Sequence, residues 1–236
     1  MTLRGWRSPN FDQRKMSPDM VVLHYTDMAD VNAAIRWLCA PESKVSAHYV
    51  ITADGAVVPL VDEADRAWHA GVSSWEGVRD INGRAIGIEL DSPGHRPDAP
   101  SFPAEQIAAL LSLLDAIRDR WSIRRRAVVA HSDVAPMRKI DPGERFPWKQ
   151  LADAGHAIFV PLPEKGIDVT PEELWQDLER AGYAPPSSAD EATALLRAFH
   201  RRHRPNAVEL GADPITAALA KAVADETAKD GEPSPA

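Results

Sequence analysis

The sequence predicts an α/β fold with a central mixed β-sheet flanked by helices, followed by a small C-terminal domain of three helices. The first part depends on short apolar runs that end in a polar residue and alternate with helical periodicity. The second part depends on a change of composition at residues 159–166, FVPLPEKG, after which three helix-start signals follow. We expect one domain over residues 1–160, a second over 161–230, and a disordered tail over 231–236.

The composition is typical of a globular protein that buries a sizeable core. Of 236 residues, 44% are hydrophobic and 26% are charged. A formal net charge of −8 argues against a broad nucleic-acid-binding surface, which needs many Lys and Arg residues to neutralise phosphates. The single cysteine, Cys39, excludes an intrachain disulfide and a cysteine-rich zinc module, and we expect it to be buried on a helix face. The sequence does not set the oligomeric state, and we favour a monomer.

The location of the protein is predicted from missing signals. No stretch approaches the roughly 18 apolar residues of a membrane span, and the N-terminus has no hydrophobic signal segment. We therefore expect a cytoplasmic protein without a membrane span. A periplasmic location stays open if a natural leader is missing from this sequence.

The first third of the chain contains the signals of a strand, a helix and a hairpin. Residues 1–18 are polar and are expected to form an extended arm. The apolar run 21–23 predicts a buried strand that ends at His24. An i, i+3, i+4, i+7 pattern predicts a helix over 31–38. Two β-rich runs within 47–60, separated by Ala-Asp-Gly, predict a hairpin, because the glycine tolerates the positive φ of such a turn.

The middle of the chain predicts a long loop, two further strands and a core helix. Residues 66–83 contain glycines, serines, two tryptophans and a histidine without a sustained period, so we expect a long surface loop, and loops of this length are usually functional. A short buried strand, 85–90, carries one carboxylate, Glu89, which needs either a partner or access to solvent. The apolar stripe of 103–121 predicts a core helix. The run 127–130 predicts a strand that leads into His131 and a loop.

The C-terminal part contains four helix signals. A short helix around residues 148–154 closes the first domain. Thr-Pro-Glu-Glu at 170–173 is a capping box with proline at the first helical position. Ser188 repeats the capping pattern, and Asp213 with the following proline begins a helix that runs to about residue 228. The expected core of the three helices consists of apolar residues: Leu174, Leu178, Leu195, Leu196, Phe199, Ile215 and Leu219.

Chemistry-bearing residues occur at the predicted strand ends. His24 and His131 follow two strands, and Asp141 comes ten residues after His131, a spacing that only a folded loop could use for a ligand pair. Two histidines and one carboxylate form a known set of ligands for catalytic zinc, which leaves one position for water. Glu89 is then the candidate general base and Lys139 the candidate stabiliser of an oxyanion. The alternative is structural: a strand-capping histidine, a turn-forming aspartate and a solvated lysine.

Five segments, in order, resemble the zinc-dependent N-acetylmuramoyl-L-alanine amidases of the AmpD and AmiD group. They are VVLHYT, KVSAHYVI, RAWHAGVSSWEG, IGIEL and HSDVAPMRKIDPG, within roughly residues 15–160. The resemblance implies a mixed sheet flanked by helices, with His24, His131 and Asp141 as Zn²⁺ ligands, Glu89 as the general base and Lys139 as the oxyanion stabiliser. It implies hydrolysis of the amide between N-acetylmuramic acid and the first L-alanine of the stem peptide.

The resemblance also suggests residues around the reacting groups. Trp68 and His69 resemble residues that line the substrate cleft, although a tryptophan is as often part of a core. Arg79 could meet a carboxylate of the stem peptide, or it could be a solvated loop arginine. His48 and Tyr49 lie on a strand near the expected metal, where they either support its ligands or simply pack.

The C-terminal segment LLRAFHRRHRP resembles the three-helix peptidoglycan-binding module of the AmiD branch. AmiD enzymes are usually exported, whereas AmpD enzymes act in the cytoplasm on recycled fragments. We expect an amidase that acts on muropeptide fragments, in the 1,6-anhydro form, during peptidoglycan recycling, with a helical module that only buttresses the catalytic domain. The alternatives are an exported amidase that cuts intact wall, a non-catalytic peptidoglycan-recognition protein, or an α/β scaffold with incidental histidines.

Overall fold

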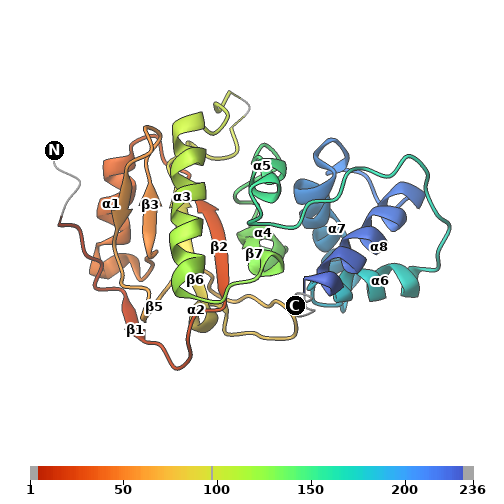
Figure 1. Ribbon diagram of the computed structural model, residues 1–236, viewed down its shortest axis with the longest axis horizontal. Helices are drawn as coiled ribbons and strands as arrows, with labels where there is room; N and C mark the ends of the chain where they lie inside the picture. Colours follow the sequence, from red (N-terminus) through yellow and green to blue (C-terminus); the bar gives the residue numbers. More distant parts are fainter. Residues whose placement is uncertain (1–4, 97, 231–236) are drawn as a thin grey trace.

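The protein is built on a five-stranded mixed sheet, seen in the computed structural model of the chain, which describes residues 5–96 and 98–230 (Figure 1). The strand order is β4-β3-β6-β2-β7, in which only β4 runs antiparallel to its neighbour. The strands are β2 (Met20–Tyr25), β3 (Tyr49–Ile51), β4 (Val57–Pro59), β6 (Ala85–Leu90) and β7 (Val128–Ala130). The predicted mixed sheet, its strands and the hairpin with Gly55 at φ 83° are confirmed.

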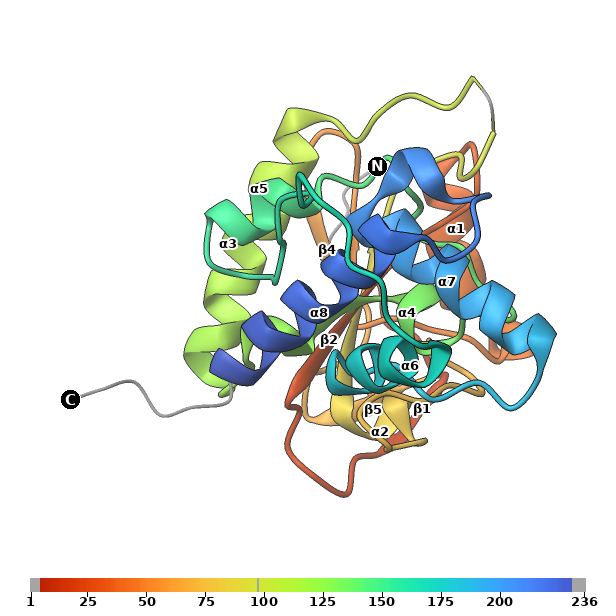
Figure 2. The same ribbon diagram turned by 90° about the vertical axis from the view of Figure 1, so that its right-hand side faces the viewer.

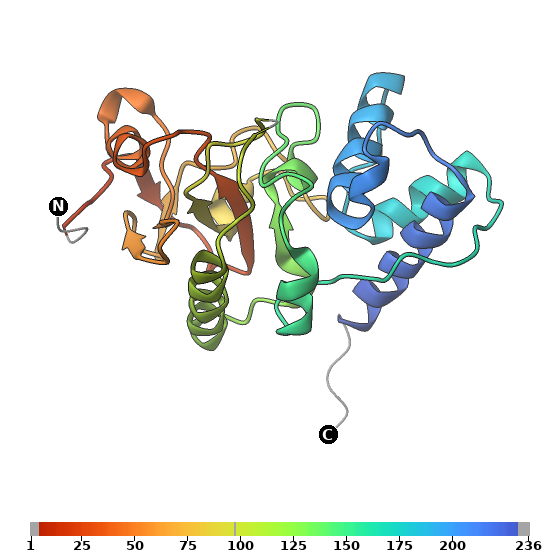
Figure 3. The same cartoon turned by 90° about the horizontal axis from the view of Figure 1, so that it is seen from above.

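Helices cover both faces of this sheet. Helix α3 (Ala104–Arg120) packs Leu110 and Leu114 into the main core on one face. Helix α1 (Val31–Leu38) packs Ile35 into a smaller cluster with Val50, on the other face. Figure 3 shows α3 lying on one side of the strands. The periodicity of each helix therefore predicted both its existence and the face that it buries.

Local capping fixes where the helices begin. The Asp30 side chain accepts from the backbone N–H of Asn32 at the start of α1. Thr170 and Glu173 form the predicted capping box of α6 (Pro171–Arg180). Ser188 caps α7 (Ala189–His203), and Asp213 caps α8 (Pro214–Lys229). Each cap satisfies backbone donors that have no partner within the helix. The remaining helices are short: α2 (Ile81–Arg84), α4 (His131–Val134), α5 (Trp148–Asp153), and the 3₁₀ turns Pro41–Ser43, Arg125–Ala127 and Pro205–Ala207.

The three C-terminal helices α6, α7 and α8 lie together beside the β7 edge of the sheet (Figures 1 and 2). Their predicted core residues are buried, apart from Ile215, which is half-buried. This core joins the core under the sheet in one continuous cluster. The boundary at residue 160 stays a prediction, and the expected tail 231–236 lies outside the described residues.

Two local expectations are wrong, and a third is incomplete. The extended arm also contains β1 (Phe11–Gln13), which pairs antiparallel with β5 (Asp65–Ala67) in a separate two-stranded sheet. The segment 66–83 is not simply a surface loop, because it contains part of β5 and α2 and buries Ala70 and Trp75. His131 begins the single helical turn α4 directly after β7 rather than a loop. These three features depend on contacts between distant segments, which the local periodicity of the sequence does not reveal.

The prediction that Cys39 lies on a buried helix face is wrong. It caps the C-terminus of α1, and its side chain is only partly buried. Among the helices of residues 5–96 and 98–230, none has both the length and the apolarity needed to cross a bilayer.

Candidate active site

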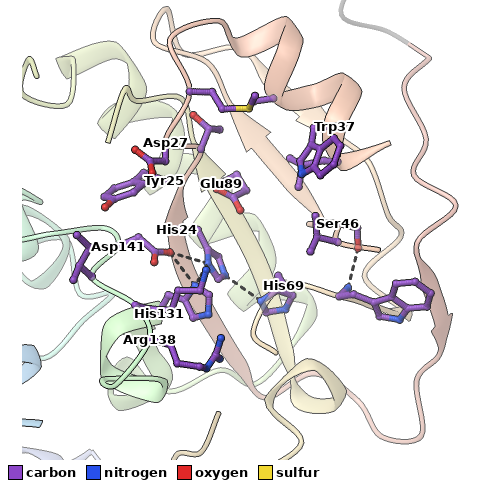
Figure 4. Close-up of a pocket in the computed structure, with 18 of the residues that line it drawn as sticks. His24, Tyr25, Asp27, Trp37, Ser46, His69, Glu89, His131, Arg138 and Asp141 are labelled. Carbon is purple, nitrogen blue, oxygen red and sulfur yellow. Dashed lines mark hydrogen bonds and ion pairs between the residues drawn. The ribbon is translucent and has the colours of Figure 1, made fainter. Parts of the chain in front are cut away.

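Three side chains from distant parts of the sequence converge on one point. The Nδ1 atoms of His24 and His131 lie 2.8 Å apart, and Oδ2 of Asp141 lies 3.1 Å from the first and 3.0 Å from the second. All three residues are buried. Figure 4 shows the carboxylate of Asp141 and the two imidazoles pointing toward one another. The structure thus brings together the three predicted ligand residues.

Adjacent parallel strands and one helical turn deliver these side chains. His24 is near the end of β2 and pairs in register with Glu89 on β6. His131 is the first residue of α4, at the end of β7, which pairs with β2 on its other side. Since parallel strands end at the same edge of a sheet, the polar residues at their ends meet there. The backbone N–H of Ser132 donates to the carbonyl of Asp141 at 3.0 Å, which holds the loop of Asp141 against α4.

The outer nitrogen of each imidazole has its own hydrogen-bond partner. Nε2 of His131 lies 3.2 Å from the carbonyl oxygen of Ala70, a pure acceptor, so this nitrogen carries the proton. Nε2 of His24 lies 3.1 Å from Nδ1 of His69. The tautomer assigned to His131 from its carbonyl partner leaves its inward Nδ1 with a free lone pair, and Nδ1 of His24 faces the same point.

His69 fits beside His24 because residue 87 is a glycine. A Cβ atom at Gly87 would lie 2.5 Å from the ring of His69, too close for any real contact. The ring of His69 therefore occupies space that a side chain at position 87 would fill. His48 supports the same corner: its ring meets His69 edge to face at 5.7 Å, and its Nδ1 accepts from the backbone N–H of Gly87. His48 thus contacts His69, which in turn contacts His24, and His48 itself is not one of the converging residues.

Burial keeps these histidines neutral. It lowers the pKa of His24 to about 4, aided by nearby His131, and lowers the pKa of His48 to about 3, aided by Arg14. The pKa of His69 is held well below its ordinary value by burial and by His24. For Asp141, burial would raise the pKa, but the two imidazoles outweigh it and hold the pKa below the ordinary value. At neutral pH the centre therefore contains the neutral imidazole of His24 and the carboxylate of Asp141.

This arrangement fits a divalent cation. Two imidazole nitrogens and one carboxylate oxygen lie within hydrogen-bond distance of one another, and a cation between them would accept a lone pair from each. Two imidazoles with one carboxylate suit a borderline-soft ion such as zinc, and three protein ligands leave a position for water. Among the described residues, these three form the group of His, Cys, Asp and Glu side chains that could hold a metal ion.

Glu89 and Lys139 line the same cavity, whose volume is about 440 Å³. Oε2 of Glu89 is buried and has no hydrogen-bond partner within the described part of the chain. Burial, together with the charge of Asp141, raises the pKa of Glu89 well above its ordinary value. A buried carboxyl without a partner is costly to the fold, and such groups are concentrated at functional sites.

Of the other predicted site residues, some line the cavity and others lie away from it. Trp68 lines the cavity, and its backbone N–H donates to Oγ of Ser46 at 2.8 Å. Tyr49 does not support the metal ligands: it pairs with Ile88, one residue before Glu89, so its side chain is on the opposite face. Its hydroxyl donates to Glu63 at 2.7 Å, beside the end of α3.

Arg79 lies outside this cavity. It is exposed and lines a separate hollow of about 460 Å³ between residues 72–74 and the segment 183–187. The predicted contact of Arg79 with a substrate bound at the converging histidines therefore gains no support. The loop around Arg79 turns toward the C-terminal helices, a direction that the local sequence does not reveal.

The sequence reasoning missed three residues of the cavity wall. Trp37, on α1, is 51% exposed and faces the cavity (Figure 4). Its exposed position on an otherwise apolar helix pattern was the available signal. His95 lines the cavity and pairs with Glu144 at 3.2 Å. Arg138 also lines it, with its guanidinium donating to the Ala70 carbonyl at 3.1 Å. No local pattern distinguishes these last two from surface residues.

Comparison with known proteins places this site in a family. The family model described as N-acetylmuramoyl-L-alanine amidase matches residues 14–144, which include all three converging residues and more than half of the chain. The chain belongs to the N-acetylmuramoyl-L-alanine amidase family and is an amide hydrolase of that class.

Individual relatives show how far the likeness extends. The chain is 33% identical to N-acetylmuramoyl-L-alanine amidase AmiD of Escherichia coli, over 89% of this chain and 84% of that protein. It is 33% identical to 1,6-anhydro-N-acetylmuramyl-L-alanine amidase AmpD of Haemophilus influenzae, but over only 62% of this chain and 89% of that protein. The AmiD likeness thus reaches into the helical region that the AmpD match does not fill.

Solved structures also resemble nearly the whole chain, including the C-terminal helices. The complex of E. coli AmiD with anhydro-N-acetylmuramic acid-L-Ala-D-γ-Glu-L-Lys superposes with a TM-score of 0.79 at 31% identity, covering 96% of this chain and 92% of that one. AmpDh3 of Pseudomonas aeruginosa in complex with an anhydromuramic pentapeptide gives 0.79 at 30% identity, covering 96% and 98%. The predicted family and fold are confirmed.

Proposed function

We propose that the protein is a zinc-dependent amidase that hydrolyses the amide between the lactyl group of N-acetylmuramic acid and the first L-alanine of the stem peptide. The observation that carries this proposal is the convergence of His24, His131 and Asp141 on one point, in a cavity that also contains the buried, unpartnered carboxyl of Glu89. The three converging residues are the proposed zinc ligands.

The zinc ion, when bound, supplies Lewis acidity that makes water a stronger nucleophile and polarises the scissile carbonyl. Glu89 is the proposed general base, which accepts the proton of the attacking water and then donates it to the leaving amine of L-alanine. A raised pKa suits the second step, in which the group must hold the proton until it is donated. Lys139, on the loop before Asp141, is the proposed donor to the negative charge that develops on the carbonyl oxygen.

The remaining cavity residues have supporting roles in this proposal. Ala70 and His69 fix the orientation of the two imidazoles through the bonds described above, as outer partners of metal ligands usually do. Trp37 and Trp68 line the cavity and offer flat apolar surfaces to a sugar or a peptide. His48 acts through His69.

The proposed substrate is the soluble 1,6-anhydro form. AmpD relatives are named as 1,6-anhydro-N-acetylmuramyl-L-alanine amidases, and AmiD and AmpDh3 have been solved with anhydromuramic peptides. A role in peptidoglycan recycling and a cytoplasmic location follow as parts of the proposal. Fractionation of cells that express the natural protein tests the location: recovery in the periplasm would instead favour an exported wall hydrolase.

Product analysis by mass spectrometry tests the function directly. The protein is incubated with soluble anhydro-muropeptides and, separately, with intact sacculi, each with and without a zinc chelator. We expect free stem peptides from the soluble substrate, no product after complete metal removal, and recovery when zinc is added back. Undiminished cleavage by the metal-free protein would overturn the mechanism, and binding without cleavage would indicate a recognition protein.

A further inference from the structure

The helix turn that carries His131 is tied to the C-terminal helices by a buried ion pair. The carboxylate of Asp133 accepts from the guanidinium of Arg202 on α7 at 2.7 Å, and the two side chains are 0% and 4% exposed. It also accepts from the hydroxyl of Tyr183, which follows α6, at 2.8 Å. Both partners come from the C-terminal helical region, whereas Asp133 lies two residues after His131.

The turn α4 needs such an anchor because it is too short to be stable alone. A helix of four residues closes almost no internal hydrogen bonds, so its orientation is set by contacts outside it. Oδ2 of Asp133 accepts from the backbone N–H of Ala130 at 2.9 Å, which joins the end of β7 to the turn. The same carboxylate therefore holds the backbone on both sides of His131.

Arg202 reaches further than this one carboxylate. Its second terminal nitrogen donates to the carbonyl of Val128 on β7 at 3.2 Å, and its guanidinium lies 4.2 Å from the centre of the Trp148 ring on α5. A planar guanidinium can make these contacts at once, whereas a lysine cannot. One side chain of α7 thus contacts the strand, the turn and the helix that surround the backbone of His131.

We infer that Arg202 and Tyr183 are positioning residues for His131, so that the C-terminal helices help to hold one ligand of the proposed metal site in place. They act through Asp133, which aims the Nδ1 atom of His131 at His24 and Asp141. The inference builds on the proposed metal site and adds what holds one ligand in place. Outer partners of metal ligands typically change metal affinity by roughly 10- to 100-fold.

The zinc dissociation constant of the full-length protein tests this inference, measured by competition with a chromogenic chelator. Tyr183→Phe removes only a hydroxyl and keeps the ring that meets Trp75 edge to face at 5.0 Å. Arg202→Met removes the charge and retains most of the side-chain volume. We expect zinc affinity to fall by roughly 10-fold or more in both variants, with an altered absorption spectrum of the cobalt-substituted protein.

The matched control is Arg204→Gln, which breaks an ion pair that lies within the helical region, from Arg204 to Asp213 at 2.7 Å. It should lower the unfolding midpoint without changing zinc affinity. The inference is overturned if Tyr183→Phe binds zinc within twofold of the unaltered protein, or if Arg204→Gln weakens binding equally. Tyr183→Phe decides alone should Arg202→Met fail to fold. Failure of the unaltered protein to bind zinc would defeat the proposed metal site itself.

Discussion

His24 and Glu89 face each other in register across the two central parallel strands, β2 and β6. The pairing puts both side chains on the same face of the sheet, so a proposed metal ligand and the proposed base open into one cavity. The neighbouring residues Leu23 and Ile88 point into the opposite face and form part of the core. A shift of one residue in this ladder would bury one group under α3 and separate the two functions.

Glu89→Gln should retain zinc and lose turnover. The amide has nearly the shape of the carboxyl but cannot accept a proton, so we expect kcat to fall by roughly 10²- to 10⁴-fold. Burial raises the pKa of Glu89, which means that ionising it at neutral pH destabilises the folded state, so the variant should be no less stable. Asp91→Asn, which removes another carboxylate just beyond the same strand, is the control and should keep its activity.

Steady-state kinetics and bound-metal analysis measure both effects. A Glu89→Gln variant with more than a tenth of the original kcat would assign the proton transfer to another group. Loss of zinc in this variant would show that Glu89 is needed to hold the ion, which the geometry does not predict.

His24→Ala should abolish stoichiometric zinc binding, because two remaining ligands hold the ion far more weakly than three. Metal content after gel filtration gives the stoichiometry. His95→Ala is the matched control: it removes an imidazole from the same cavity wall that pairs with Glu144 and not with the converging residues. If His24→Ala still retains one zinc per chain, the proposed ligand set is wrong.

Gly87→Ala should displace His69 and so weaken the proposed metal site. The added methyl would overlap the ring of His69, which must then move away from Nε2 of His24. We expect a loss of roughly 1–3 kcal/mol in unfolding free energy from overpacking and about 10-fold weaker zinc binding. Gly211→Ala serves as the control, since no heavy atom lies within 4 Å of the Cβ that it would add.

Urea unfolding and chelator competition on both variants distinguish the outcomes. Equal zinc affinity in Gly87→Ala and the unaltered protein would mean that His69 does not orient His24. Equal destabilisation of Gly211→Ala would mean that a general backbone effect is being measured.

The stability of the protein should fall as the pH drops below about 6.5, in part because of His203. Burial and the charge of Arg202 hold the pKa of His203 well below its ordinary value. The unfolded chain therefore takes up a proton near pH 6.5 that the folded chain does not take up. Acidification below that pH consequently lowers the free energy of unfolding. One such group contributes about 1.4 kcal/mol per pH unit.

Urea denaturation between pH 7.5 and 5.5, with chelator present throughout, measures the slope. Buried His24, His48 and His69 also have lowered pKa values and contribute in the same direction. The unaltered protein is therefore compared with His203→Leu, which removes this one titration. We expect a shallower pH dependence by about one proton in the variant. Identical slopes would show that His203 is protonated in the folded state or is exposed to solvent.

Local sequence patterns predicted most of the elements of this fold because their causes are local. The period of Ile107, Leu110 and Leu114 determines which face of α3 is buried, and Thr170 with Glu173 determines where α6 begins. The strand ends at His24 and His131 were predictable as well, since a short apolar run that terminates in a polar residue is typical of a buried strand that reaches the edge of its sheet. These features do not depend on which segment packs beside them.

The surroundings of the site could not be predicted in the same way. Tyr49 and His48 are adjacent in sequence, yet one bonds Glu63 beside α3 and the other supports His69. Arg79 belongs to a segment whose direction is set by contacts with the C-terminal helices. Which face a residue takes, and what lies across from it, depends on strand register and on partners tens of residues away.

By itself, the sequence determined the kinds of chemistry that the protein offers: two imidazoles, two carboxylates and a lysine at strand ends or in the loop that follows, and the order of helices and strands around them. The tertiary structure alone decided that Nδ1 of His24 and Nδ1 of His131 come within 2.8 Å, that Gly87 leaves room for His69, and that Arg202 reaches across to Asp133. Residue type and local period are encoded in neighbouring positions, whereas convergence arises from the packing of segments that are distant in the chain.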